Sequence, residues 1–214
     1  RLCRREGQPV PTSPADVTDV DVQPCLKADG PGVAHVTEAM ARFPNLARMH
    51  AHGFVVDVAA VRGLGPAPAF QGNRDAPNDV LQPVRGCISG EGEPPGGLLL
   101  AVRAARYGEA HVPEGAFYKN NTLASIAVPA GFTSIGDGAF ARCSSLASIE
   151  LPAGLTSIGN AAFYRCSSLA SVELPAGLTS IGAFAFRGCS SLASVELPAS
   201  HTHIGAGGFP ANCT

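Results

Sequence analysis

Residues 135–203 consist of three successive 23-residue segments that differ at few positions. They read IGDGAFARCSSLASIELPAGLTS (135–157), IGNAAFYRCSSLASVELPAGLTS (158–180) and IGAFAFRGCSSLASVELPASHTH (181–203). The same interval continues on both sides, since phenylalanine recurs every 23 residues at Phe117, Phe140, Phe163, Phe186 and Phe209. A fixed period of about 20 to 29 residues is typical of a solenoid, in which each repeat forms one coil stacked on the last.

Each repeat contains the apolar pattern of a short strand, seen in Leu169-x-x-Val172-x-Leu174. Alternation along a strand predicts that Val172 and Leu174 point inward while Ser171 and Glu173 point outward. Pro175 follows at once, and because proline lacks an N–H group it ends the strand. The copies therefore predict one strand per coil, stacked in parallel.

A second inward set follows each proline, and a glycine stands in each repeat where we expect the chain to turn with positive φ. These glycines are Gly136, Gly159, Gly182 and Gly205. The columns together predict a core of Phe140, Cys143, Leu146, Leu151, Ile158, Phe163, Cys166, Leu169, Leu174, Ile181, Phe186, Cys189, Leu192 and Leu197.

The unit L-x-x-V-x-L-P-x-x-L-T-x-I-G-x-x-A-F-x-x-C-x-x resembles the BspA-type, or Treponema-type, leucine-rich repeat over about residues 112–214. The resemblance implies a leucine-rich-repeat solenoid of the α/β type, with a parallel β face and short turns or 3-10 pieces on the other side. It further implies a recognition scaffold at the cell surface or secreted from the cell. The first and last units depart from the motif, because Asn120 and Asn212 replace cysteine and His201 replaces leucine.

The cysteines and histidines do not predict a metal site, a disulfide or a cofactor. Cys143, Cys166 and Cys189 form one column, whose Cβ atoms at a coil spacing of ~4.8 Å are too far apart for the usual disulfide. Three sulfurs in a row also cannot close a tetrahedral zinc site, so we interpret the column as a buried ladder. His50-x-His52 and His201-x-His203 supply pairs of imidazoles without a third ligand.

The outward columns are the candidate binding residues: Ser148, Glu150, Ser171, Glu173, Ser194 and Glu196. They form either a solvated, solubilising strand face or a shallow acidic strip that favours a basic partner or a hydrated cation. Arg142 and Arg165 repeat on the opposite side, but Arg187 is displaced by one position, so no continuous arginine ladder is predicted.

The N-terminal half has no such period, and we expect a small irregular α+β region of unknown fold over residues 1–62. Within it, 37–43 predicts a helix with Thr37 as its cap, and 54–61 predicts a strand. Residues 63–97, rich in Gly and Pro, predict a loop or linker. Residues 98–111 predict a hairpin around Tyr107-Gly108 that caps the repeats of 112–214.

The charge balance and apolar runs of the chain limit the classes of partner that we expect. Residues 1–111 hold 11 Lys/Arg and 12 Asp/Glu, and residues 112–214 hold 4 and 5, so a nucleic-acid partner is not expected. The longest apolar run, Leu98 to Val102, is far shorter than the ~20 residues of a membrane span. The chain begins at Arg1 and stops at Thr214, just before the next repeat leucine is due, and we expect a fragment of a longer array.

Three functional hypotheses remain open at this stage. The first is a non-catalytic scaffold that recognises a protein or polysaccharide with the solenoid surface. The second is an enzyme whose site lies in residues 1–97, with His50, His52 and Asp57 as candidates and the repeats as a targeting arm. The third is a structural spacer, which near-identical coils also fit. No catalytic triad spacing or phosphate loop is recognisable, so the first hypothesis is preferred.

Overall fold

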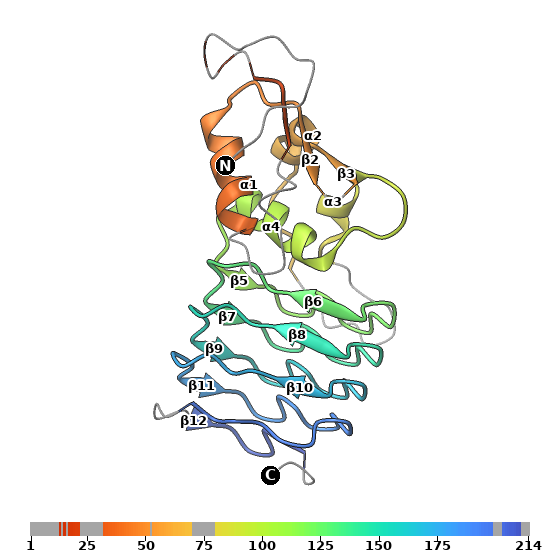
Figure 1. The fold of residues 1–214 in the computed structure, drawn as a ribbon, viewed down its shortest axis with the longest axis vertical. Helices are drawn as coiled ribbons and strands as arrows, with labels where there is room; N and C mark the ends of the chain where they lie inside the picture. Colours follow the sequence, from red (N-terminus) through yellow and green to blue (C-terminus); the bar gives the residue numbers. More distant parts are fainter. Residues whose placement is uncertain are drawn as a thin grey trace. The chain divides into compact units, whose positions relative to one another are not determined.

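The computed structural model describes residues 13, 15, 17–21, 32–51, 53–69, 80–198 and 203–210. The chain forms two compact units (Figure 1). The first, which we refer to as the N-terminal unit, comprises Arg1–Ala67 and Leu81–Glu109; the second, the solenoid, comprises Pro68–Val80 and Ala110–Thr214.

The N-terminal unit combines a mixed sheet with helices. Its sheet has the order β1 (Asp19–Asp21), β2 (Arg48–Ala51), β3 (Phe54–Asp57) and β4 (Ile88–Ser89). Its helices are α1 (Gly32–Arg42), α2 (Val58–Gly63), α3 (Gln82–Arg85) and α4 (Gly96–Tyr107). β1 and β2 are parallel, and the other two pairs are antiparallel. Met49, Val56 and Val102 are among the buried residues of a core shared by the sheet and the helices.

Two predicted elements of this unit have different bounds. The helix expected over 37–43 is the second half of α1, so Thr37 lies within the helix and does not cap it. The strand expected over 54–61 ends at Asp57, whose carboxylate accepts a hydrogen bond from Ala60 N at 2.9 Å and caps α2. This bond satisfies one of the N–H groups that a helix start leaves without a partner, and it outweighs the strand preference of the following valines.

The hairpin predicted over 98–111 is wrong, because most of the segment is the helix α4. Its leucines and alanines are strong helix formers, and a run of apolar residues does not by itself distinguish strand from buried helix. Gly108 ends the helix with φ of 69°, and its N–H donates to Ala104 O at 2.8 Å. The Tyr107-Gly108 pair is therefore a helix end and not a hairpin turn.

The linker predicted over 63–97 also contains regular structure. Pro83 lies in the first turn of α3, where proline costs no helical hydrogen bond. β4 then joins the sheet by pairing Ile88 with Val56 and Ser89 with Val55. Residues 70–79 of this segment lie outside the described part of the chain.

The solenoid has two parallel sheets, because its coils contribute strands on two sides (Figure 1). The first sheet contains β6 (Ser125–Ala127), β8 (Ser148–Glu150) and β10 (Ser171–Val172). The second sheet contains β5 (His111–Val112), β7 (Ser134–Ile135), β9 (Ser157–Ile158), β11 (Ser180–Ile181) and β12 (His203–Ile204). Paired residues differ by 23 positions, as in Ser148 with Ser171. The predicted solenoid is confirmed, and the second sheet is an addition to it.

The phenylalanine column forms a continuous stack through the coils. Neighbouring rings from Phe117 to Phe209 have centroids 5.0–5.3 Å apart and planes within 11° of parallel. Phe140, Phe163 and Phe186 are fully buried. The other predicted core residues that are buried are Cys143, Leu146, Ile158, Cys166, Leu169, Ile181, Cys189 and Leu192.

Three leucines assigned to the core by sequence are not buried. Leu151 and Leu174 are half-buried, and Leu197 is 50% exposed. Leu151 and Leu174 lie beyond the last residues of β8 and β10, directly before a proline. The strand alternation that points side chains inward therefore stops before these positions.

The glycine column has a different role from the one predicted. Its members do not have positive φ; instead, a Cβ atom on Gly182 would lie 2.5 Å from both Asn160 N and Gly159 C in the preceding coil. Glycine is needed because the backbones approach too closely for any side chain. The positive φ angles occur in two other columns: Gly115, Gly138, Ala161, Phe184 and Gly207, and Lys119, Arg142, Arg165 and Gly188.

We expect Gly182→Ala to destabilise the solenoid by roughly 1–3 kcal/mol or more, because both coils would have to separate to admit one methyl group. Gly177→Ala is the matched control in the same coil, where the added Cβ would meet only Ala153 O at 3.8 Å. Its effect should stay within about 0.5 kcal/mol. Denaturant unfolding midpoints measure both, and equal midpoints for the two variants would contradict the close-approach explanation.

Candidate functional site

We refer to six residues with alternating serine and glutamate side chains as the acidic strip: Ser148, Glu150, Ser171, Glu173, Ser194 and Glu196. The first four lie on or directly after β8 and β10 of the first sheet, whereas Ser194 and Glu196 are the equivalent positions of the next coil, where the structure has no strand. All six side chains are exposed. The residues between them hold the sheet in place, since Ile149 and Val172 are 6% and 7% exposed. Sequence reasoning placed these six residues on the outward face, and the structure gives them that exposure.

The strip concentrates negative charge along one line. Neighbouring coils are about 4.8 Å apart, a distance at which two carboxylates in water repel by only ~1 kcal/mol. Within the described part of the chain, none of the three glutamates forms an ion pair. The row is therefore a regular anionic surface that a basic group can approach from solvent.

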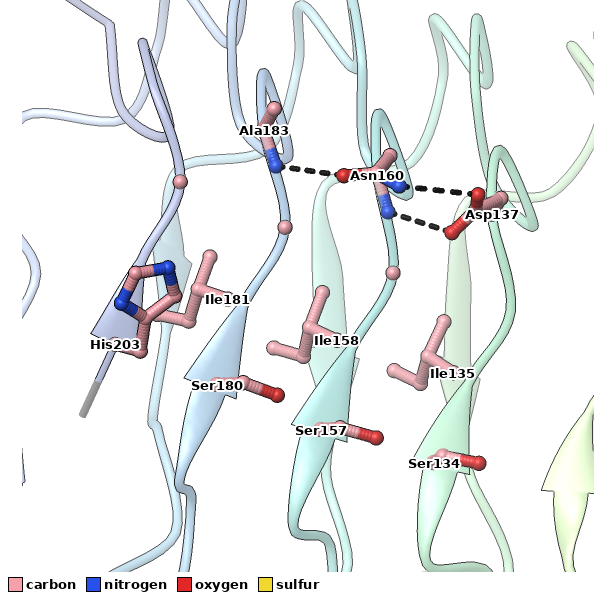
Figure 2. Close-up of a pocket in the computed structure, with 13 residues that line it drawn as sticks. Ser134, Ile135, Asp137, Ser157, Ile158, Asn160, Ser180, Ile181, Ala183 and His203 are labelled. Atoms are coloured by element: carbon pink, nitrogen blue, oxygen red, sulfur yellow. Dashed lines mark hydrogen bonds between the residues drawn. The ribbon is translucent and has the colours of Figure 1, made fainter.

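A groove crosses the second sheet (Figure 2). It has a volume of about 480 Å³ and is lined by Ser134, Ser157 and Ser180 from successive strands, with His203 at one end. We refer to it as the serine groove. Sequence analysis did not find it, because the strands of the second sheet were not predicted.

Two side chains beside the serine groove bridge successive coils (Figure 2). Asp137 accepts hydrogen bonds from Asn160 N at 2.7 Å and from Asn160 Nδ2 at 3.1 Å. Asn160 Oδ1 in turn accepts from Ala183 N at 2.9 Å. These bonds satisfy backbone N–H groups at the turn after each strand, so the pair stabilises the groove wall.

A third surface lies on the turn side of the coils. Lys119, Arg142 and Arg165 stand in one column and line a groove of about 580 Å³ together with Asn121 and polar serines. Sequence analysis identified the two arginines but missed Lys119, which extends them by one coil. We refer to these three residues as the basic column.

The cysteine column is a buried ladder of thiols. The Sγ atoms of Cys143, Cys166 and Cys189 donate to the carbonyl oxygens of Phe117, Phe140 and Phe163 at 2.9, 3.0 and 3.1 Å. None of the three forms a disulfide, and none has exposed surface. Burial raises the pKa of Cys143 to about 12 and also raises the pKa of Cys166. The thiols of Cys143 and Cys166 are therefore neutral at physiological pH, and all three cysteine side chains pack in the core.

We expect Cys143, Cys166 and Cys189 to resist alkylation in the folded protein and to react after unfolding, because the thiolate is the nucleophile. Since folding raises the pKa values of Cys143 and Cys166 from 9.0, the stability that these two thiols contribute is complete below pH 9.0 and is lost as the pH rises toward 12. Peptide mass mapping after iodoacetamide treatment checks the first point. Rapid native labelling of the column would contradict it.

Two of the three candidates for an enzymatic site in the N-terminal unit, His50 and Asp57, have separate structural partners. Asp57 caps α2, and His50 instead contacts Asp19, with Nε2 3.3 Å from Asp19 Oδ1. Asp19 is 3% exposed and also accepts hydrogen bonds from Arg48 Nε at 2.9 Å and Nη2 at 3.2 Å. His52, from the first histidine pair, and His201, from the second pair, lie outside the described residues.

The cluster of Asp19, Arg48 and His50 joins β1 to β2. Burial by itself would raise the pKa of Asp19, but the hydrogen bonds from Arg48 and His50 outweigh it and lower that pKa below 3.8. Sequence analysis missed Asp19, because its partners are about 30 residues away and are brought together only by the parallel pairing of the strands.

We expect Asp19 to stabilise the N-terminal unit fully above pH 3.8, and this stability to be lost as the pH falls through its lowered native pKa. Asp19→Asn should lower the free energy of unfolding by about 1 kcal/mol at neutral pH, because Arg48 stays largely hydrated. It should also reduce the loss of stability that the wild-type chain shows as the pH falls below 3.8. The helical circular dichroism signal during urea unfolding at several pH values measures both. If the variant lost as much stability at acid pH as the wild-type chain does, the role assigned to Asp19 would be contradicted.

Among the described residues, no group of three or more His, Cys, Asp or Glu side chains is arranged to hold a metal ion. In the same part of the chain, no helix has the length and apolar character needed to cross a membrane.

The fold and its columns define a leucine-rich-repeat solenoid. Residues 110–214 match the family model described as BspA type leucine rich repeat region, in six copies, and the resemblance predicted from the repeat motif is confirmed over this stretch. Among solved structures, the chain is similar to the T. pallidum leucine rich repeat protein, with 41% identity and a TM-score of 0.47. The match covers 48% of this chain and 48% of that one, so the chain spans about half the length of that protein. No curated protein matches significantly.

Proposed function

We propose that this chain is a non-catalytic recognition scaffold and that the acidic strip is its binding surface for a basic protein. The observation that carries the proposal is a row of exposed glutamates: Glu150 and Glu173 directly follow the buried Ile149 and Val172 of the first sheet, and Glu196 recurs 23 residues further on. A leucine-rich-repeat solenoid is a fold suited to such a role, although fold by itself does not establish a binding site.

Rigidity is what makes the strip suitable for recognition. Glu150 lies on β8 beside Ile149, which is buried, and the phenylalanine stack fixes the coil beneath. The carboxylates are therefore presented without ordering a loop, which reduces the entropic cost of binding. A row of like charges also steers a basic partner to the surface and fixes its register.

A basic protein suits the strip better than a bound calcium ion. Ca²⁺ needs about six to eight oxygen ligands at 2.3–2.6 Å, converging on one point. Carboxylates that point outward from a sheet at ~4.8 Å intervals do not converge in this way. Extended arrays of lysine or arginine side chains, in contrast, are matched by a linear row.

A polysaccharide ligand is the second candidate, and the serine groove supports it. Ser134, Ser157 and Ser180 place one hydroxyl per coil along the serine groove, next to Ile135, Ile158 and Ile181 (Figure 2). Hydroxyl groups both donate and accept hydrogen bonds, as the hydroxyls of a sugar do. The enzyme hypothesis is less well supported, because Asp57 and His50 have separate structural partners.

We expect the triple variant Glu150→Gln, Glu173→Gln and Glu196→Gln to bind a lysine-rich peptide about tenfold more weakly than the wild-type chain, as three exposed charge pairs are lost. Its melting temperature should be unchanged, because the three side chains are exposed. The matched control is Glu38→Gln, Glu91→Gln and Glu114→Gln, which removes the same charge from exposed positions elsewhere. Fluorescence anisotropy measures binding, and equal weakening in both variants would refute a specific role for the strip.

A further inference from the structure

Residues 112–214 contain three arginines, and all three lie close together on the turn side of the coils. Arg165 N donates to Arg187 O at 2.8 Å, and the two residues line one groove of about 500 Å³. A second groove, of about 580 Å³, shares Arg165 with the first and is also lined by Arg142. The one-position displacement of Arg187 in its repeat therefore does not remove it from the other two. We refer to Arg142, Arg165 and Arg187 as the arginine patch.

The arginine patch has no carboxylates of its own. All three side chains are exposed, and among the described residues none of the three forms an ion pair. Neither groove is lined by an aspartate or a glutamate. Like charges in successive coils repel one another, so an anionic ligand would stabilise this surface.

Aromatic rings hold two of the guanidinium groups in place. Arg165 Cζ lies 5.3 Å from the centre of the Tyr164 ring, and Arg187 Cζ lies 5.2 Å from the centre of the Phe184 ring. The donors of a guanidinium group lie in its plane, so a ring against its face leaves the N–H edge open to an anion. A Cβ atom on Gly188 would lie 3.0 Å from Arg165 Cγ, so the missing side chain makes room for Arg165 across the next coil.

The backbone of the coils does not require arginine at these positions. Arg142 and Arg165 have φ angles of 63° and 57°, a left-handed conformation that is unfavourable for residues with a Cβ atom. Gly188 occupies the equivalent position of the next repeat with φ of 82°, so glycine satisfies the same turn. Unfavourable backbone conformations of this kind occur often at binding sites, and here they point to a role for the two side chains at the surface.

Hydrogen-bond acceptors lie beside the cations in both grooves. The hydroxyl groups of Ser167 and Ser190 donate to Ser144 O and Ser167 O of the preceding coils, at 3.5 and 3.4 Å. Because a hydroxyl has one hydrogen, each oxygen keeps acceptor capacity for a further donor, and both side chains are exposed. The two grooves thus offer guanidinium donors to an anionic group and serine oxygens to hydroxyl groups.

We propose that the arginine patch binds an anionic polysaccharide, a chain of sugars that carry carboxylate or sulfate groups. The anionic groups pair with the guanidinium edges, as oxyanions commonly do, and sugar hydroxyls donate to Ser167 and Ser190. An acidic peptide fits less well, because its carboxylates come without hydroxyl donors. Its same-side residues are also about 6.6–6.8 Å apart, whereas successive coils are about 4.8 Å apart. The patch and the acidic strip are different surfaces, so this inference does not depend on the proposed function.

Binding of the full chain to immobilised polysaccharides, measured by biolayer interferometry, tests the proposal. The probes are polygalacturonate, which carries carboxylates, dextran sulfate, which carries sulfates, and neutral dextran. The wild-type chain should bind at least one of the two anionic probes and not dextran, and the one it prefers identifies the anionic group. Binding should weaken as salt shortens the Debye length to about 3 Å, because the charge pairs are exposed. Binding to neither anionic probe, or equal binding to dextran, would overturn the proposal.

Substitutions locate the site. The triple variant Arg142→Gln, Arg165→Gln and Arg187→Gln should bind the anionic probe about tenfold more weakly. Arg165→Gln alone should bind about threefold more weakly. Its matched control is Arg42→Gln, which removes one positive charge from an exposed position of α1 and should bind like the wild-type chain. Equal losses in the two single variants would show attraction to net charge only and would overturn a site at the patch.

Arg165→Gly separates binding from folding. Glycine adopts the left-handed conformation without the cost that a Cβ atom carries, so this variant should not melt at a lower temperature than the wild-type chain. It should nevertheless bind the anionic probe at least as weakly as Arg165→Gln. Full binding by a folded Arg165→Gly variant would contradict the role assigned to this side chain.

Two further comparisons exclude the other surfaces and the other class of ligand. The triple variant Ser134→Ala, Ser157→Ala and Ser180→Ala should keep its affinity; a loss there and not in the arginine variants would place the polysaccharide in the serine groove and overturn this proposal. Polyglutamate that bound as tightly as the anionic polysaccharides, with the same dependence on the arginines, would make the ligand an acidic protein and would also overturn it.

The glutamate variant of the acidic strip distinguishes this proposal from the proposed function. That variant should bind the anionic probe at least as tightly as the wild-type chain does, although it binds the lysine-rich peptide more weakly. If the anionic probe depends on the arginines while the peptide does not depend on the glutamates, the arginine patch stands and the acidic strip falls. The reverse result would retain the acidic strip and overturn the arginine patch.

Discussion

The close stacking of backbone on backbone is the constraint on which the solenoid depends. Gly182 N donates to Ile158 O at 2.8 Å and Phe163 N donates to Ala185 O at 2.8 Å, so each coil is bonded to the coils before and after it. The glycine column makes this approach possible, because a Cβ at Gly182 would overlap the preceding backbone. A single coil of 23 residues cannot bury its own apolar side chains, and stacking supplies the missing contacts.

Stacking at a fixed interval converts every position of the repeat into a row. Inward rows become continuous layers, such as the phenylalanine stack and the thiols that donate to carbonyl oxygens of the preceding coil. Outward rows become lines of side chains of the same chemical type, such as the acidic strip and the basic column. The surface of the solenoid is thus built from a few periodic lines, which favours partners that are themselves extended or periodic.

The N-terminal unit is not built from repeats. Its sheet pairs β1 with β2 across a long stretch of chain, and the buried carboxylate of Asp19 is satisfied by Arg48 and His50 from the neighbouring strand. A buried charge of this kind requires partners in good geometry, because its desolvation is otherwise costly. These residues hold the sheet together, and Asp57 caps a helix, so two of the ionisable groups that sequence singled out in this unit, His50 and Asp57, have structural roles.

The sequence by itself determined the stacked coils, the period, the buried Phe163 and Cys166 columns and the outward orientation of Glu150 and Glu173. It could do so because a repeated pattern leaves one consistent set of inward positions. Only the tertiary structure decided the second sheet, the reason for glycine at Gly182, and the addition of Lys119 to the arginine column. Those features depend on distances between coils and on φ angles, which a pattern of residue types does not contain. The same holds for α4 and for Asp19, because neither a buried helix nor a distant ion pair has a local signature.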